Sequence, residues 1–252
     1  MPVILTALGV GGATVIGALL GFLLKKPSHR LNDIILSFAA GVMLAAAVIG
    51  LIIPSLEYGG DFGLIYAVTG IFAGAVCLNL IDKLVPHLHK ISGVGAEEMH
   101  PESAAKLNKI LLFVIAIAIH NLPEGIAAGV SFGTDNIGQA LTVAGGIALQ
   151  NIPEGMVIIA PMISSGMTKR RTFIIAMMTG VVEVIGTFIG YFAVSISTAI
   201  LPFALAFAGG TMLYVISDEM IPETHAHGAE RAATYSLLVG FAVMLVFDVL
   251  LG

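Results

Sequence analysis

The sequence predicts an all-α integral membrane protein with eight transmembrane helices, and two observations lead to this fold class. Hydrophobic residues make up 58% of the 252-residue chain, charged residues only 11%, and the mean hydropathy is +1.01, far above that of a soluble domain. The apolar residues also gather in eight stretches of about 20 residues, the length that a helix needs to cross a bilayer. We therefore expect a single transmembrane domain over residues 1–252.

The eight stretches follow one another along the chain with polar connections between them. The first has no basic leading segment and no small-residue cleavage site, so we expect it to be retained as a span. The longest connection, 86–108, is polar and has no clear helical period, which predicts a cytoplasmic loop. The predicted spans run roughly over residues 3–24, 34–56, 63–85, 109–132, 139–163, 172–195, 200–221 and 232–252.

The positions of Lys and Arg test this count, because these residues collect in the cytoplasmic loops of membrane proteins. All 11 fall in alternate connections, and the remaining connections carry acidic residues but no base. Both termini are therefore predicted to be extracytoplasmic. The net charge of −5 provides no basic surface for nucleic acid, and the single Cys77 forms no disulfide within the chain. The 11 basic residues are Lys25, Lys26, Arg30, Lys83, Lys90, Lys106, Lys109, Lys169, Arg170, Arg171 and Arg231.

An internal repeat is visible when the chain is compared with itself at an offset of 169 residues. The segment FAAGVML (38–44) matches FAGGTML (207–213), the glycines of the first span match those of the sixth, and Tyr66 aligns with Tyr235. This offset corresponds to five predicted spans, and an odd number of spans reverses the direction of the chain. The sequence therefore predicts an inverted 3+2+3 repeat, with spans four and five at its centre, where transporters of this build commonly bind their substrate.

The central spans carry two related polar motifs, HNLPEG (120–125) and QNIPEG (150–155). His120 and Glu124 are four residues apart and share one face of a helix, and Gln150 and Glu154 repeat this spacing. Ionisable side chains at this depth are costly and are usually functional. We interpret the two motifs as the core of a buried metal site.

A third acid, Glu183, lies about 12 residues into span six, near the middle of the bilayer. Divalent cations bridged by Glu124 and Glu154 would offset both the repulsion between these carboxylates and the cost of their burial. Imidazole, carboxylate and carboxamide ligands together favour Zn2+, with Fe2+, Mn2+ and Cd2+ as further candidates. The repeat counterpart of Glu183 is Thr14, so the two halves differ at the site.

Three other interpretations fit parts of this pattern. A single intramembrane His is often a hydrogen-bonded packing residue, and a chain of carboxylates also marks a proton relay, as in a proton-coupled carrier of an organic solute. No cluster of Arg, Lys or aromatic residues indicates a pocket for such a solute. An intramembrane metal-dependent hydrolase would need a metal, a bound water and a general base, but the chain has no HExxH motif. We expect no enzymatic activity.

At HNLPEG and QNIPEG the sequence resembles the ZIP (Zrt/Irt-like protein) family of divalent-metal transporters, in particular its compact bacterial members. The resemblance extends over all eight spans and implies a binuclear site. One ion would be held by His120, Glu124, Gln150 and Glu154, with Met43 as an extra ligand; Met43 also fits the role of core filler. The second ion would be held by Asn121, Glu124, Asn151, Glu154 and Glu183. Many family members have His at the position of Gln150.

The resemblance also implies an exit route, because DEMIPETHAHG (218–228) is similar to the cytoplasmic-end motif of the family. The alternative is an ordinary solvated helix end with loop histidines. Taken together, we expect a plasma-membrane carrier that moves zinc toward the cytoplasm; the family implies a homodimer and an elevator-like shift of spans one, four, five and six against the others. The candidate exit residues are Glu219, Glu223, His225, His227, His87 and His89.

Overall fold

The helices begin at capping residues that lie a few positions before the apolar stretches. The computed structural model describes residues 2–24, 27–92, 118–134, 136–164 and 166–251, and of residues 82 and 84–92 the backbone alone. The Ser28 side chain accepts a hydrogen bond from the Leu31 amide at 3.2 Å, and Thr168 accepts one from the Arg171 amide at 3.4 Å. Each satisfies an amide that has no partner within its helix. These caps explain why two helices start before the predicted spans.

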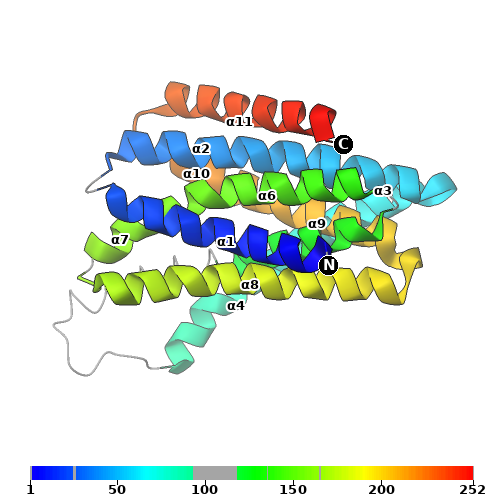
Figure 1. Ribbon diagram of the computed structural model, residues 1–252, viewed down its shortest axis with the longest axis horizontal. Helices are drawn as coiled ribbons and strands as arrows, with labels where there is room; N and C mark the ends of the chain where they lie inside the picture. Colours follow the sequence, from blue (N-terminus) through cyan, green and yellow to red (C-terminus); the bar gives the residue numbers. More distant parts are fainter. Residues whose placement is uncertain (1, 25–26, 93–117, 135, 165, 252) are drawn as a thin grey trace.

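The described residues form helices and no strand, which confirms the predicted all-helical fold for that part of the chain (Figure 1). Among the described residues, seven helices are long and apolar enough to cross a membrane. The fourth predicted span, 109–132, is described only from residue 118 onward, so the count of eight stays a prediction. The helices are α1 Pro2–Leu23, α2 His29–Ala45, α3 Ile53–Tyr58, α4 Gly63–Ser92, the helix 118–130, α6 Ile137–Val157, α7 Ile159–Ser164, α8 Lys169–Ile196, α9 Leu201–Val215, α10 Ile221–Thr224 and α11 Glu230–Leu251.

Two of the long helices contain a π-helical segment. Ala46–Ile52 joins α2 to α3, and Ile216–Met220 joins α9 to α10, so each set forms one continuous helix. Shifted back by 169 residues, the second segment covers residues 47–51 and falls inside the first. Segments of this kind are rare and are frequent at functional sites.

The predicted loop 86–108 is wrong in its first part, because α4 continues to Ser92. The polar residues that follow Pro86 mark the end of the apolar surface, whereas the backbone hydrogen bonds of the helix persist beyond it. Residues 93–108 lie outside the described part of the chain.

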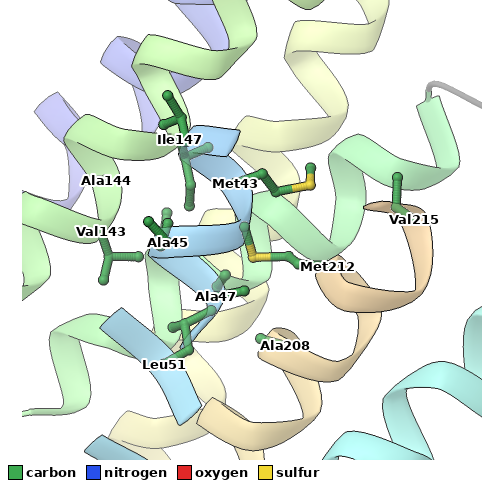
Figure 2. Packing of buried hydrophobic residues seen from close by; sticks show 14 of the residues in the cluster. Met43, Ala45, Ala47, Leu51, Val143, Ala144, Ile147, Ala208, Met212 and Val215 are labelled. Atoms are coloured by element: carbon green, nitrogen blue, oxygen red, sulfur yellow. The ribbon is translucent and has the colours of Figure 1, made fainter. Parts of the chain in front are cut away.

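The helices pack in two groups. In the first, α1 contacts α6 and α8, and glycines of the helix 118–130 touch the backbone of α8. In the second, α4 packs against α9, and α11 packs against α2. Contacts between α2 and α6 join the groups, and the first and last residues of the described chain lie toward the same end of the bundle (Figure 1). An apolar cluster fills the space between α2, α6 and α9, with Met43, Ile147 and Met212 among its members (Figure 2).

Backbone contacts at glycines bind the first group together, and they occur in matched pairs. A Cβ added at Gly17 would lie 2.1 Å from the Ile152 carbonyl oxygen, and one added at Gly186 would lie 2.5 Å from that of Leu122. The two glycines are 169 residues apart, and the two contacted residues are equivalent positions of the two motifs. The same helix packing therefore occurs twice.

A second matched pair brings the motifs themselves against α1 and α8. A Cβ at Gly155 would lie 2.2 Å from the carbonyl oxygen of Thr14, and one at Gly125 would lie 2.2 Å from that of Glu183. Only glycine permits this approach, since real Cβ atoms do not come so close to a backbone oxygen.

The second group shows matched pairs as well, with a change of offset. Gly41 approaches the Leu237 carbonyl as Gly210 approaches that of Ile71. The glycines are 169 residues apart, but Ile71 and Leu237 are separated by 166. In the third helix of each triplet, the contacts therefore match at an offset of 166 residues. The alignment of Tyr66 with Tyr235 had indicated an offset of 169 residues, which is three longer.

We expect Gly17→Ala to lower the free energy of unfolding by about 1–3 kcal/mol, the usual cost of overpacking, because the added methyl group meets backbone. Gly12→Ala is the matched control on the same helix, since a Cβ there has no heavy atom within 4 Å; its effect should be neutral or slightly stabilising. Thermal unfolding of both variants in detergent measures the difference. Equal stability of the two would contradict the close approach of α1 and α6.

Candidate metal centre

The two polar motifs lie on neighbouring helices in the interior of the first group. HNLPEG is on the helix 118–130 and QNIPEG is on α6, whose N-cap Asn136 accepts a hydrogen bond from the Gln139 amide at 3.2 Å. His120 is buried and Glu154 is half-buried. The remaining polar site residues are at most 1% exposed: Asn121, Glu124, Gln150, Asn151 and Glu183.

The Glu183 carboxylate is the point at which side chains from four helices meet. Oε1 accepts hydrogen bonds from the Thr14 hydroxyl at 2.7 Å and from Nδ2 of Asn121. Oε2 accepts one from Nδ2 of Asn151 at 2.7 Å. These donors offset much of the cost of burying the charge.

The side-chain amides of the two asparagines make equivalent hydrogen bonds, Asn121 to the backbone of α8 and Asn151 to the backbone of α1. Nδ2 of Asn121 also lies 3.4 Å from the Thr179 carbonyl oxygen, and Nδ2 of Asn151 lies 3.2 Å from that of Val10. Val10 and Thr179 are again 169 residues apart. Both amides therefore turn their nitrogen toward Glu183 and α1 or α8.

Around this point lie buried polar atoms that make no hydrogen bond of good geometry with any described residue. They include both carboxylate oxygens of Glu124, both amide atoms of Gln150, and the Oδ1 atoms of Asn121 and Asn151. An unpartnered buried carboxylate is costly and calls for an explanation. A cation bound by these oxygens would supply one.

No three His, Cys, Asp or Glu side chains in the described ranges are arranged to hold a metal by themselves. The reason is visible at two residues. Glu183 is occupied by its three donors, and His120 turns its Nε2 to within 2.8 Å of Glu219 Oε1, although without hydrogen-bond geometry. A cation at this centre would therefore need the carboxamide oxygens.

A cavity of about 530 Å³ begins at His120 and Glu154 and runs between α2, α6 and the end of α9. At its far end, His227 Nδ1 lies 3.1 Å from the buried Asp33, and its ring stacks on His29 with centroids 4.8 Å apart. Apolar side chains form much of the cavity wall, and the polar and acidic residues along this path are His29, Asn32, Asp33, Asp218, Glu219, Glu223 and His227. It leads from the motifs to the end of the bundle where α2 begins.

A second cavity of about 400 Å³ lies beside the opposite end of the same long helix. Its lining includes Glu57, Asn136, Gln139 and Asp248, and it shares no residue with the first. One cavity therefore lies toward each end of the bundle, and of these two the first alone is lined by motif residues.

The predicted exit residues divide into three sets. Glu219, Glu223 and His227 line the first cavity. His225 does not: its Nδ1 lies 2.9 Å from the Ile221 carbonyl oxygen and its Nε2 lies 3.1 Å from the Thr234 hydroxyl. The side chains of His87 and His89 lie outside the described part of α4.

Met43 was a predicted extra ligand, and the structure places it in the apolar core. Four further residues that the sequence did not single out line the first cavity. Met43 is 1% exposed and lies in the apolar cluster with Met212, its counterpart at 169 residues (Figure 2), as expected of a core residue. His29, Asn32, Asp33 and Asp218 line the cavity without having been predicted. No spacing pattern connects these four, because the fold brings them together from the start of α2 and the end of α9.

The family model described as ZIP zinc transporter matches residues 96–248. The chain belongs to the ZIP zinc transporter family. Among its relatives, zinc transporter GufA of Myxococcus xanthus is 39% identical over 99% of this chain and 98% of its own length.

Two further bacterial relatives of this ZIP chain cover most of its length. Zinc transporter ZIPB of Bordetella bronchiseptica is 37% identical over 95% of this chain and 78% of its own. Zinc transporter ZupT of Chlorobaculum parvum is 35% identical over 94% and 92%. The family membership that the two motifs indicated is thereby confirmed, and the chain is a multi-pass membrane protein.

A substitution at Glu124 distinguishes two effects of its carboxyl group, the loss of stability caused by its burial and its contribution to binding a cation. Glu124→Met should raise the free energy of unfolding of the metal-free protein by about 1–3 kcal/mol, because it removes a buried carboxyl group that makes no firm hydrogen bond with the described residues. Added Zn2+, the ion expected from the sequence, should stabilise the wild type and no longer stabilise the variant. Thermal unfolding with chelator and with Zn2+ measures both effects.

Asp61→Asn serves as the control, since Asp61 is an exposed acid on the turn before α4. It should match the wild type in both conditions. A metal-free Glu124→Met protein that is less stable than the wild type would show that the carboxylate has partners in the apo state.

Proposed function

We propose that this chain carries Zn2+ and chemically similar divalent cations across the plasma membrane toward the cytoplasm. The single observation that carries the proposal is the set of unpartnered oxygens on Glu124, Gln150, Asn121 and Asn151, enclosed in a ZIP chain whose relatives are named zinc transporters. A transported ion needs oxygens that bind it and a path by which it leaves. The cavity from His120 and Glu154 to His227 supplies such a path.

The proposed centre holds two ions bridged by Glu124 and Glu154. The first ion takes His120 and Gln150 in addition, and the second takes Asn121, Asn151 and Glu183. For the first ion, His120 has to leave Glu219, which lies 2.8 Å away. For the second, Glu183 has to exchange some of its hydrogen bonds for the cation.

The transport cycle that fits this packing moves the first group of helices against the second. The first group, α1, the helix 118–130, α6 and α8, is held together by glycine contacts to backbone and by the hydrogen bonds at Glu183. Its matched contacts support an inverted repeat with α6 and the helix 118–130 at the centre. The pair of His120 and Glu219 joins the two groups, so it would break and re-form in each cycle.

A hydrolase and a proton-coupled carrier of an organic solute fit the site less well. The cavity is lined by acids, histidines and apolar side chains, which suits a cation. The relatives are named as transporters. Eight spans, extracytoplasmic termini and a homodimer remain part of the proposal.

Uptake of radioactive zinc into proteoliposomes tests the function. Glu154→Gln should lower the rate at least about tenfold, in line with the loss of a metal-site group, since it removes a charge at the point where the cavity meets the centre. Asp61→Asn should transport like the wild type. Competition by Fe2+, Mn2+ and Cd2+ under an imposed pH gradient reports selectivity and proton coupling. Wild-type uptake by Glu154→Gln would refute its bridging role.

Thiol accessibility tests the direction in which the centre opens. In a Cys77→Ser background, Leu36→Cys places a thiol on the first cavity and Ile53→Cys places one on the second, both on the same continuous helix. An impermeant thiol reagent should modify the first from the side of the basic loops and the second from the other side. Modification of both from one side would contradict the proposed orientation.

A further inference from the structure

Thr14 differs from three other buried threonines in the use of its hydroxyl. Threonine in a helix usually bonds back to a carbonyl of the preceding turn. Thr179, Thr187 and Thr211 do so, with distances of 2.8, 2.9 and 2.7 Å to the carbonyl oxygens of Ala176, Glu183 and Ala208. Thr14, which is 2% exposed, instead donates from α1 to the Glu183 carboxylate on α8.

The Glu183 carboxylate determines how the side-chain amides of Asn121 and Asn151 are oriented. A carboxylate accepts about four hydrogen bonds, and three donors already contact Glu183. In each amide the nitrogen faces Glu183, so the oxygen on the other branch of the planar group faces away. These Oδ1 atoms of Asn121 and Asn151 are the ones that are buried and unpartnered.

We propose that Thr14 is a positioning residue of the metal centre. Its hydroxyl holds the Glu183 carboxylate in place, and the carboxylate in turn holds both amide nitrogens, so that both amide oxygens are presented to the cation. Thr14 does not contact the ion in this arrangement and acts through Glu183. The inference rests on the proposed function, because it assigns a role within the same centre.

The consequence of losing the hydroxyl follows from the geometry. Without it, the carboxylate keeps only the two amide donors of Asn121 and Asn151, and no group of α1 prevents it from turning about its last bond together with them. The amides then lose their fixed partner, and an NH2 group can take the place of an oxygen toward the cation. Binding weakens although every proposed ligand is still present.

Thr14→Val tests this, because valine has nearly the shape of threonine and lacks the donor. The full-length protein in detergent should bind Zn2+ about tenfold more weakly by equilibrium dialysis, the lower end of the effect of lost partners of metal ligands. In proteoliposomes KM should rise about as much, with the maximal rate changed less than twofold. Thr14→Ser keeps the hydroxyl and should restore both values.

Thr187→Val is the matched control, since Thr187 is buried on α8 and donates to the backbone of the same Glu183. It should cost similar thermal stability and leave zinc affinity and KM unchanged. If Thr14→Val behaves like Thr187→Val in binding, or if Thr14→Ser fails to rescue it, the positioning role is refuted. Absence of zinc binding and uptake in the wild type would instead refute the proposed function, so the two failures are distinguishable.

Discussion

The cost of burying carboxylates among membrane-spanning helices is the constraint on which the rest of this structure depends. Removing an ionised group from water costs several kcal/mol even after relaxation, so it persists only with compensating partners. Glu183 has three donors, whereas no hydrogen bond of good geometry reaches Glu124 within the described residues, although the Gln150 amide lies beside it. The two acids thus differ in kind: the first stabilises the contact between helices, and the second is a buried acid without a firm hydrogen bond, at a place where a cation would remove the cost of burial.

The close backbone contacts explain why the donors reach Glu183. The Thr14 hydroxyl is short, and it can bridge two helices only if α1 and α8 nearly touch. Gly11 and Gly180 face one another one turn away, each with the carbonyl oxygen of the other within 2.5 Å of an added Cβ. Gly125 and Gly155 bring the motif helices equally close. The glycines at these contacts are therefore needed for the candidate metal centre, because larger residues would separate the donors from the carboxylate.

The features that the sequence predicted correctly are those that depend on local composition or on residue spacing along one helix. The apolar stretches, the pairs at i and i+4, and Glu183 at their depth all follow from the pattern. It could not predict contacts between helix ends. Asp33 and His227 are 194 residues apart and meet at 3.1 Å only in the fold. His225 was assigned to the exit by its position in a motif, but its neighbours Ile221 and Thr234 engage both ring nitrogens.

Thr14 and Glu183 occupy equivalent positions in the two halves of the repeat but are different residue types. The reason is that these two positions contact each other. Residues at the same position in both halves meet one another where the halves come together, as these two do at 2.7 Å. Two glutamates there would put like charges in contact in a buried site, which is unfavourable. Two threonines would provide no charge to hold the amide nitrogens of Asn121 and Asn151. One hydroxyl donor and one carboxylate place a single acidic group beside a hydrogen-bonding partner. A centre built on this contact therefore requires different residues at this position in the two halves of the repeat.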